Sequence, residues 1–244
     1  MIKTVIYSRE GVSHKLPSSS FNLIIGRSGT GKTMFLKLLF SRICHVRTGV
    51  PMEEITMQMK LGDISSVNVD MEIGGTVAGT VFYFPSFGSL FYEKGYTDLP
   101  LHLRKTMGVY NSWVNRGYNF DQKVKEMWGI TGTSDGILKI KIFLAVLKEI
   151  KGGDTLLVDL PEAGLDPILW KWWIDKLVGL IDKGVQVFMT THDFFIYTYV
   201  RSIVENGIIY YFKPDDIQVF SMLEGLPEDA PILKIPIEVL ESAM

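Results

Sequence analysis

The sequence predicts an α/β fold in which helices cover a mostly parallel β-sheet. From residue 136 onward, apolar helical patterns alternate with short buried strand patterns, and such alternation is typical of parallel sheets. In the first half, a glycine-rich string separates an apolar strand expected at 21–25 from a helix expected at 32–44. Together these observations predict a single domain spanning residues 1–244, with an insertion at 85–133.

The remaining elements follow from the spacing of the apolar residues. Further strands are expected at 2–8, 12–16, 67–73 and 76–84. The stretch 85–133 is aromatic and mixed in charge, so we expect a helical lobe there, with helices at 101–114 and 120–128. Beyond it we expect helices at 136–150, 167–182 and 194–205, strands at 155–159 and 185–190, and an edge hairpin at 208–212 and 217–223.

Composition narrows the class of protein. A hydrophobic fraction of 47% with 21% charged residues is that of a globular chain, and a formal charge of -2 gives no overall field for nucleic acid. The single cysteine, Cys44, excludes an internal disulfide and paired-cysteine zinc sites, so we expect a reducing, cytoplasmic environment. No apolar run approaches the roughly 18 to 20 residues that span a bilayer, so a membrane role would need a partner.

The glycine-rich string fits a phosphate-binding loop. Its members are Gly26, Arg27, Ser28, Gly29, Thr30, Gly31, Lys32 and Thr33. The glycines allow backbone N–H groups to face phosphates, Lys32 reaches the β- and γ-phosphates, and the Thr33 hydroxyl is offered to Mg²⁺. A turn that ends in Gly-Lys-Thr by chance is the alternative, but the strand before it and the helix after it favour the phosphate loop.

Two acids and a histidine follow later strands. Asp159 ends the strand at 155–159 and is expected to hold Mg²⁺, while Glu162 just beyond it is expected to act as general base. His192 follows the strand at 185–190, where it would touch the γ-phosphate, because ligands gather at the carboxyl ends of parallel strands. Taken alone, a strand-ending aspartate is commonly structural, and a lone histidine is commonly an ordinary surface or core residue.

In this order and spacing, the motifs resemble those of ATP-binding-cassette (ABC) ATPases. The resemblance covers most of the chain and implies a mostly parallel sheet with an antiparallel β subdomain and a small inserted helical lobe. It also implies ATP and Mg²⁺ as ligands and a homodimer that forms on ATP. Ala163 to Asp166 would be the loop that faces the other protomer.

The motif that completes the partner's nucleotide site is reduced. Ser134 and Gly136 keep the hydroxyl and backbone N–H that would meet the γ-phosphate across the dimer, whereas Asp135 and Ile137 depart from the family pattern. A simple helix N-cap at Ser134 is the compatible alternative.

Three other positions bear on the nucleotide and the lobe. Pro85 and Ser86 stand where the family has a glutamine that links Mg²⁺ to the helical lobe, and Ser86 would have to act through a water. For the adenine-stacking aromatic, Tyr7 is a candidate, with an ordinary strand position as the alternative.

Side chains outside these motifs leave further alternatives. The tryptophans of the helix at 167–182 mark a packed helix, but Trp172 lies off that stripe and would suit a partner-binding patch. Lys139 and Lys141 are expected on a solvated helix face.

The predicted function is a MgATP-dependent conformational switch, in which two protomers join head to tail on ATP and hydrolysis releases them. The absence of a guanine-reading Asn-Lys-x-Asp motif argues against a GTPase. Because the signature is reduced and the glutamine is missing, the chain resembles the DNA-repair, chromosome-maintenance (SMC-like) and defence ATPases. The alternatives are the nucleotide-binding subunit of an ABC transporter and a non-hydrolytic ATP-sensing module. A protein or nucleic-acid partner is expected but not identified by the sequence.

Overall fold

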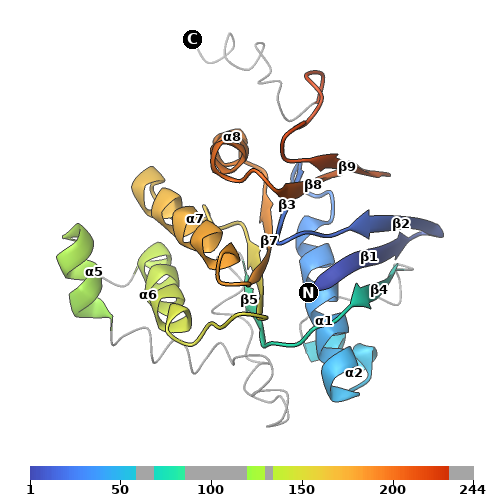
Figure 1. The fold of residues 1–244 in the computed structure, drawn as a ribbon, viewed down its shortest axis with the longest axis horizontal. Coiled ribbons are helices and arrows are strands. Elements are labelled where there is room, and N and C mark those ends of the chain that lie inside the picture. The colour runs from blue at the N-terminus through green and yellow to red at the C-terminus, as the bar shows by residue number, and fades with distance from the viewer. Residues whose placement is uncertain (59–68, 86–119, 130–133, 231–244) are drawn as a thin grey trace.

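A six-stranded sheet forms the centre of the computed structural model, which describes residues 1–58, 69–85, 120–129 and 134–230 (Figure 1). Its strand order is β5-β6-β7-β3-β8-β9, and all neighbours are parallel except β8 and β9. The strands are β3 (Phe21–Gly26), β5 (Val81–Phe84), β6 (Thr155–Asp159), β7 (Gln186–Thr191), β8 (Gly207–Phe212) and β9 (Ile217–Ser221). The mostly parallel sheet expected from the sequence is therefore confirmed.

A smaller antiparallel sheet of order β2-β1-β4 lies beside it (Figure 1). Its strands are β1 (Ile2–Arg9), β2 (Val12–Pro17) and β4 (Val69–Gly75). The side chain of Gln186 in β7 joins the two sheets, because it accepts from the backbone N–H of Ile2 at 2.9 Å and donates to its carbonyl at 2.8 Å.

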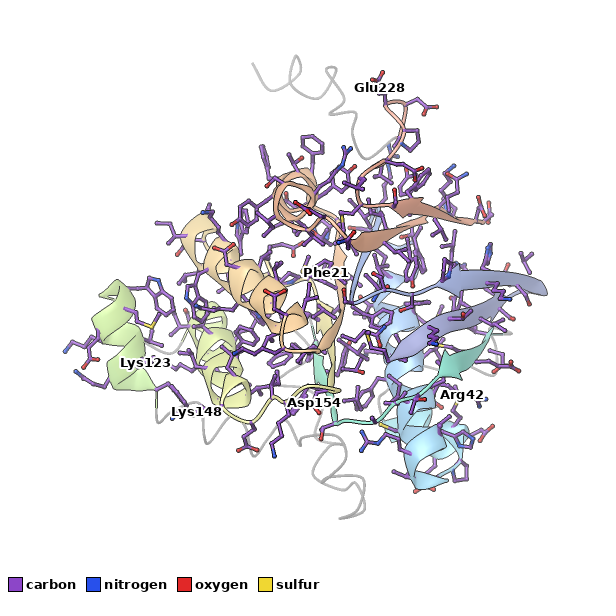
Figure 2. The ribbon with its side chains drawn as sticks, in the orientation of Figure 1. Phe21, Arg42, Lys123, Lys148, Asp154 and Glu228 are labelled. Carbon is purple, nitrogen blue, oxygen red and sulfur yellow. The ribbon has the colours of Figure 1, made fainter. Side chains whose placement is uncertain are left out.

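Helices cover both faces of the central sheet (Figure 1). The described helices are α1 (Lys32–Thr48), α2 (Met52–Gln58), α5 (Asp121–Trp128), α6 (Asp135–Leu147), α7 (Pro167–Ile181) and α8 (Phe194–Ile203). Helix α1 packs on one face of the sheet, and α6, α7 and α8 pack on the other. Successive side chains of a strand point to opposite faces of the sheet, so the core has two parts. Leu23 and Ile25 of β3 face the cluster that contains α6, α7 and α8, while Ile24 faces α1 and the antiparallel sheet. Phe21 at the start of β3 is fully buried near the middle of the molecule (Figure 2).

Local signals explain where the helices nearest the site begin and end. Gly49 ends α1 in a left-handed conformation, and its N–H donates to the carbonyl of His45. Asp166 caps α7, because its carboxylate accepts from the backbone N–H groups of Ile168 and Leu169, and Pro167 occupies the first turn. The Asp166 cap fixes the start of α7 directly after the loop that carries the predicted catalytic acid.

The structure corrects three sequence expectations. The strand expected at 76–84 is reduced to β5, because the preceding chain is held by the 151–154 turn instead: the N–H of Thr80 donates to Asp154 Oδ1 at 2.7 Å, and that of Gly79 to the carbonyl of Gly153. Helix α2 was not expected, and the helix expected at 136–150 begins one residue earlier and ends at Leu147.

The inserted lobe at 85–133 stays a prediction. Its expected helix at 120–128 agrees closely with α5, but the helix expected at 101–114 and Ser86 lie outside the described residues. None of the helices in the described ranges is long and apolar enough to cross a bilayer.

Candidate functional site

The predicted phosphate loop joins β3 to α1 at the carboxyl edge of the parallel strands. Gly29 and Gly31 have φ values of 83° and 94°, in the left-handed region that favours glycine. A Cβ at Gly26 would lie 2.4 Å from the carbonyl oxygen of Phe212, so this position requires glycine for the close approach of β8. The backbone of the loop is thus set by the residue types that suggested it.

The amine of Lys32 turns back into the loop. Its Nζ donates to the carbonyl oxygens of Gly26 and Arg27, each at 2.7 Å, and the residue is 7% exposed. Burial lowers the pKa of Lys32, and the negative charges of Asp159 and Glu162 oppose this change. Phosphate oxygens would be far stronger partners for this desolvated amine than neutral carbonyls are.

The other loop side chains divide between the interior and the solvent. Thr30 is buried, and its hydroxyl donates to the carbonyl of Arg27 at 2.9 Å, which tightens the turn. Arg27 and Ser28 are exposed in the loop.

Two oxygen donors predicted for Mg²⁺ face each other across the gap between α1 and β6. The hydroxyl of Thr33 donates to both carboxylate oxygens of Asp159, at 3.1 Å and 3.0 Å. Asp159 is fully buried, and Thr190 of β7 donates to its Oδ1 at 2.6 Å. A hydroxyl and a carboxylate suit Mg²⁺, which takes hard oxygen ligands and keeps several waters, so the donor set fits the ion.

Glu162 lies next to this pair in the loop after β6. Its Oε1 accepts from the hydroxyl of Thr191 at 2.7 Å, whereas its Oε2 is shielded from solvent and has no hydrogen-bond partner among the described residues. Burial raises the pKa of Glu162, and the hydrogen bond from Thr191 opposes that rise. A carboxylate with one fixed oxygen and one free oxygen is well arranged to accept a proton.

The threonine beside Glu162 gives a testable pH dependence. If Glu162 is the predicted base, it works only when ionised, so its raised pKa predicts that kcat falls with decreasing pH through a midpoint above the ordinary glutamate value of 4.5. Thr191→Val removes the hydrogen bond that lowers this pKa, and we expect the midpoint to move to still higher pH. At neutral pH, kcat should fall about tenfold.

The measurement is the rate of phosphate release at saturating ATP between pH 5 and pH 9 (about four units of range, chosen to bracket a tuned base). Thr198→Val, at an exposed position on α8, serves as the control. An unchanged acid limb in Thr191→Val would contradict the role given to this hydrogen bond.

His192 follows β7, as expected, and its side chain is exposed. It lies near enough to Glu162 for its positive charge to oppose the burial-driven rise in the pKa of that carboxyl. The structure thus brings Lys32, Asp159, Glu162 and His192 to one edge of the sheet, while a contact between His192 and a γ-phosphate stays a prediction.

Ser134 and Gly136 stand at the start of α6. Ser134 is the N-cap of the helix, but its exposed side chain makes no capping hydrogen bond, so the hydroxyl is open to another partner. Gly136 is buried, and a Cβ there would lie 2.0 Å from the carbonyl oxygen of Gly164. This glycine therefore allows the start of α6 to touch the Ala163–Asp166 loop of the same chain, a contact that the sequence did not indicate.

Two predictions about side-chain surroundings are wrong, and for a third side chain the structure decides between two alternatives. Lys139 and Lys141, expected on a solvated face, are 0% and 3% exposed. Of the two alternatives for Tyr7, the ordinary strand position is confirmed over adenine stacking, because Tyr7 is 2% exposed and its ring packs on Phe35 and Phe212 in the core. An apolar helix pattern around a lysine was the signal that would have indicated its burial.

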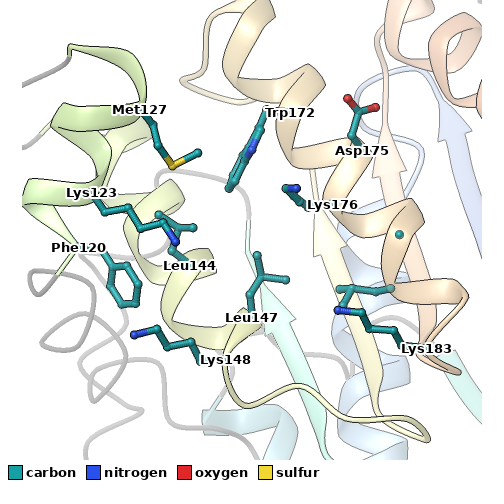
Figure 3. A pocket seen from close by; sticks show the side chains of 12 residues that line it. Phe120, Lys123, Met127, Leu144, Leu147, Lys148, Trp172, Asp175, Lys176 and Lys183 are labelled. Atoms are coloured by element: carbon teal, nitrogen blue, oxygen red, sulfur yellow. The ribbon is translucent and has the colours of Figure 1, made fainter.

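Trp172 lies at a groove between α5, α6 and α7, with a volume of about 470 Å³ (Figure 3). Its half-buried ring makes edge contacts with Trp128, at 5.0 Å between centroids, and with Phe143 at 6.1 Å. Trp172 therefore has both properties that the sequence left open, because it packs on the helices and also lines a surface groove.

Thr190 and Thr191 are the site residues that the sequence analysis missed. They end a buried strand, and their hydroxyls hold Asp159 and Glu162 respectively. The available signal was a pair of adjacent threonines at the carboxyl end of a buried strand. The predicted acids lie at the same edge of the sheet, where buried carboxylates need hydrogen-bond donors.

Comparison with known proteins identifies relatives over much of the chain. Residues 97–196 match a family model described as "AAA domain, putative AbiEii toxin, Type IV TA system". The energy-coupling factor transporter ATP-binding protein of Streptococcus sanguinis is 26% identical over 197 residues, 75% of this chain and 64% of that protein. Its counterpart from Streptococcus agalactiae is 25% identical over 210 residues, 78% of this chain and 69% of that protein.

A solved structure agrees in fold along the whole chain. It is an ATP-binding cassette of an ABC transporter in its ADP conformation, with a TM-score of 0.50 at 13% identity, covering 100% of this chain and 99% of that one.

The chain has the α/β P-loop fold of ABC ATPase domains, and it is similar to ATP-binding proteins of that type. The curated relatives above are ATP-binding proteins of transporters, so the expected resemblance to the DNA-repair and chromosome-maintenance branch is not supported.

Proposed function

We propose that this chain binds MgATP in the Gly26–Thr33 loop and hydrolyses it with Glu162 as general base. The observation that carries this proposal is the contact between Thr33 and Asp159, which brings together two residues 126 positions apart that would serve as Mg²⁺ ligands. A phosphate loop beside such a pair is the arrangement that phosphoryl transfer requires.

Each residue has one task in the proposed reaction. Lys32, whose amine already lies within the loop, binds the β- and γ-phosphate oxygens and offsets the charge that develops there. Thr33 and Asp159 would hold Mg²⁺, which would neutralise part of the phosphate charge when bound. Glu162 uses its free Oε2 to take a proton from a water, which attacks the γ-phosphorus as the bond to the bridging oxygen breaks.

We also propose that two protomers close head to tail over the nucleotides. The open hydroxyl of Ser134 supports this, because an N-cap serine that makes no capping bond at a helix N-terminus is suited to receive an anion from a second molecule. In the dimer, each Ser134 and Gly136 would face the γ-phosphate held by the partner.

Ser134→Glu tests the shared site. A carboxylate at this N-cap is compatible with the helix dipole, so folding should be retained, but it would meet the partner's γ-phosphate with like charge. We expect phosphate release to fall about 100-fold while ATP affinity changes less than about twofold.

Ser202→Glu, at an exposed position on α8, is the matched control for this experiment. Full activity in Ser134→Glu would contradict the head-to-tail arrangement but would leave the proposed ATP binding intact. Loss of ATP affinity in this variant would place Ser134 in its own protomer's site.

For the cellular role, we propose the nucleotide-binding subunit of an ABC transporter. The support is that the curated relatives are ATP-binding proteins of energy-coupling factor transporters. Co-purification of the tagged chain with an integral membrane protein encoded beside it, in detergent, tests this role. Stimulation of ATP hydrolysis by DNA instead would favour the DNA-maintenance alternative, and absence of single-turnover hydrolysis would favour a sensing module.

A further inference from the structure

The N-terminal part of α6 contacts the loop that carries Glu162 at two points. At one end, Lys139 Nζ donates to the carbonyl oxygen of Leu160 at 2.7 Å and to that of Pro161 at 3.4 Å. At the other end, Gly136 lies against the carbonyl of Gly164, so closely that a Cβ would not fit. The catalytic acid thus stands between two attachments to the same helix.

The conformation of this loop needs such support. Leu160 has a φ of 47°, in the left-handed region that a branched side chain rarely adopts. Its carbonyl accepts from the N–H of Ala163 at 3.1 Å as well as from Lys139, and its own N–H donates to the hydroxyl of Thr190 at 3.0 Å. Backbone held in a sparsely populated region by several partners is typical of functional sites.

The lysine itself is placed where a lysine is costly. Lys139 is fully buried, with Nζ 4.9 Å from the centre of the Trp173 ring. Burial lowers its pKa to about 8, and the charges of Glu162 and Asp159 oppose this shift. An apolar residue would stabilise the core more than a lysine that only filled space, because burying the amine costs free energy. The hydrogen bonds of Lys139 to the loop therefore explain why a lysine stands here.

We propose that Lys139 is a positioning residue for Glu162, and that it links contacts made at the start of α6 to hydrolysis in the same protomer. The inference rests on the proposed function for the identity of the base. Ser134 and Lys139 lie on the same short helical segment, five positions apart. A displacement of the helix N-terminus is therefore transmitted to the Leu160–Pro161 peptide.

This link gives the head-to-tail dimer a means of control. When the partner's nucleotide contacts Ser134, α6 is fixed, and through Lys139 the loop and Glu162 are fixed with it. An isolated protomer keeps its own phosphate loop but holds the base less firmly. Lys139 thereby ties the activity of one site to the occupancy of the other.

Lys139→Met tests the proposal, because methionine keeps the apolar length of the side chain and loses the donor. We expect backbone amides of the segment 160–165 to exchange hydrogen at least about tenfold faster, with exchange in β7 unchanged. We expect kcat to fall about 10- to 100-fold while KM for ATP stays within about twofold, since the phosphate loop is untouched. Lys148→Met, at the exposed end of the same helix, is the matched control and should behave as wild type.

Unchanged exchange in the 160–165 segment would overturn the proposal, whether or not the protein hydrolyses ATP. Faster exchange with an unchanged kcat would also overturn the proposal, because loosening the loop would then have no effect on catalysis by Glu162. If the wild-type protein never hydrolyses ATP, the proposed function is rejected. The exchange comparison would still show whether Lys139 holds the 160–165 segment in place. Lys139→Gln gives the same comparison if the methionine variant is insoluble.

Discussion

Replacing Lys32 by alanine is expected to weaken ATP binding at least about 100-fold. In the structure the amine is held within the phosphate loop by two carbonyl oxygens, so it is already placed where phosphates would bind. Truncating one partner of a desolvated charge pair costs about 2 to 5 kcal/mol, and 100-fold corresponds to about 3 kcal/mol.

The folded state should tolerate this change. Burial lowers the pKa of Lys32, which means that the fold disfavours the charged amine, and removing that charge offsets the two lost hydrogen bonds. We therefore expect a thermal midpoint close to that of the wild type, so that weak binding cannot be attributed to unfolding.

Calorimetric titration with ATP and Mg²⁺ measures the effect, and Lys15→Ala, at an exposed position on β2, is the control. An unchanged affinity in Lys32→Ala would show that the loop does not hold the nucleotide, and the assignment of the whole site would be lost.

The conformation of the predicted phosphate loop follows from the sequence because it depends on neighbouring residues. Every residue from Gly26 to Thr33 lies within one turn and the start of one helix, so the string itself specifies the backbone. Asp159 and His192 were found by a second route, since both follow buried strands and parallel strands end at one edge.

What the sequence could not show depends on contacts between distant segments. Lys139 was expected in solvent because lysine favours water, yet the carbonyls it binds come from a loop 21 positions further along the chain. Thr190 and Thr191 look like ordinary strand residues until the sheet register brings Thr190 opposite Asp159. The reduced β5 has the same cause, because Asp154 captures the N–H of Thr80 from 74 positions away.

Glu162→Gln is expected to lower kcat at least about 100-fold while ATP remains bound. General base catalysis contributes about 10²- to 10⁴-fold, and glutamine has almost the same shape but cannot take a proton. Its amide oxygen can still accept from the hydroxyl of Thr191, so the loop should keep its conformation.

The same substitution should stabilise the protein in neutral solution. A carboxyl whose pKa is raised by burial is disfavoured in its ionised form, so its contribution to stability improves as pH falls and is least favourable above that pKa. Glutamine carries no charge to desolvate, and we expect a higher thermal midpoint at pH 8 (about four units above the usual glutamate pKa) but little difference near pH 4 (about that pKa).

If hydrolysis releases the dimer, the variant should accumulate as a dimer with MgATP, at about twice the 27.6 kDa of the monomer by light scattering. Glu205→Gln, an exposed position after α8, should stay as wild type. Normal turnover in Glu162→Gln would remove Glu162 as the base, whereas lost turnover without a dimer would keep the base and reject the head-to-tail switch. Because turnover and dimer formation are measured separately, the role of Glu162 as base and the head-to-tail dimer can be tested independently.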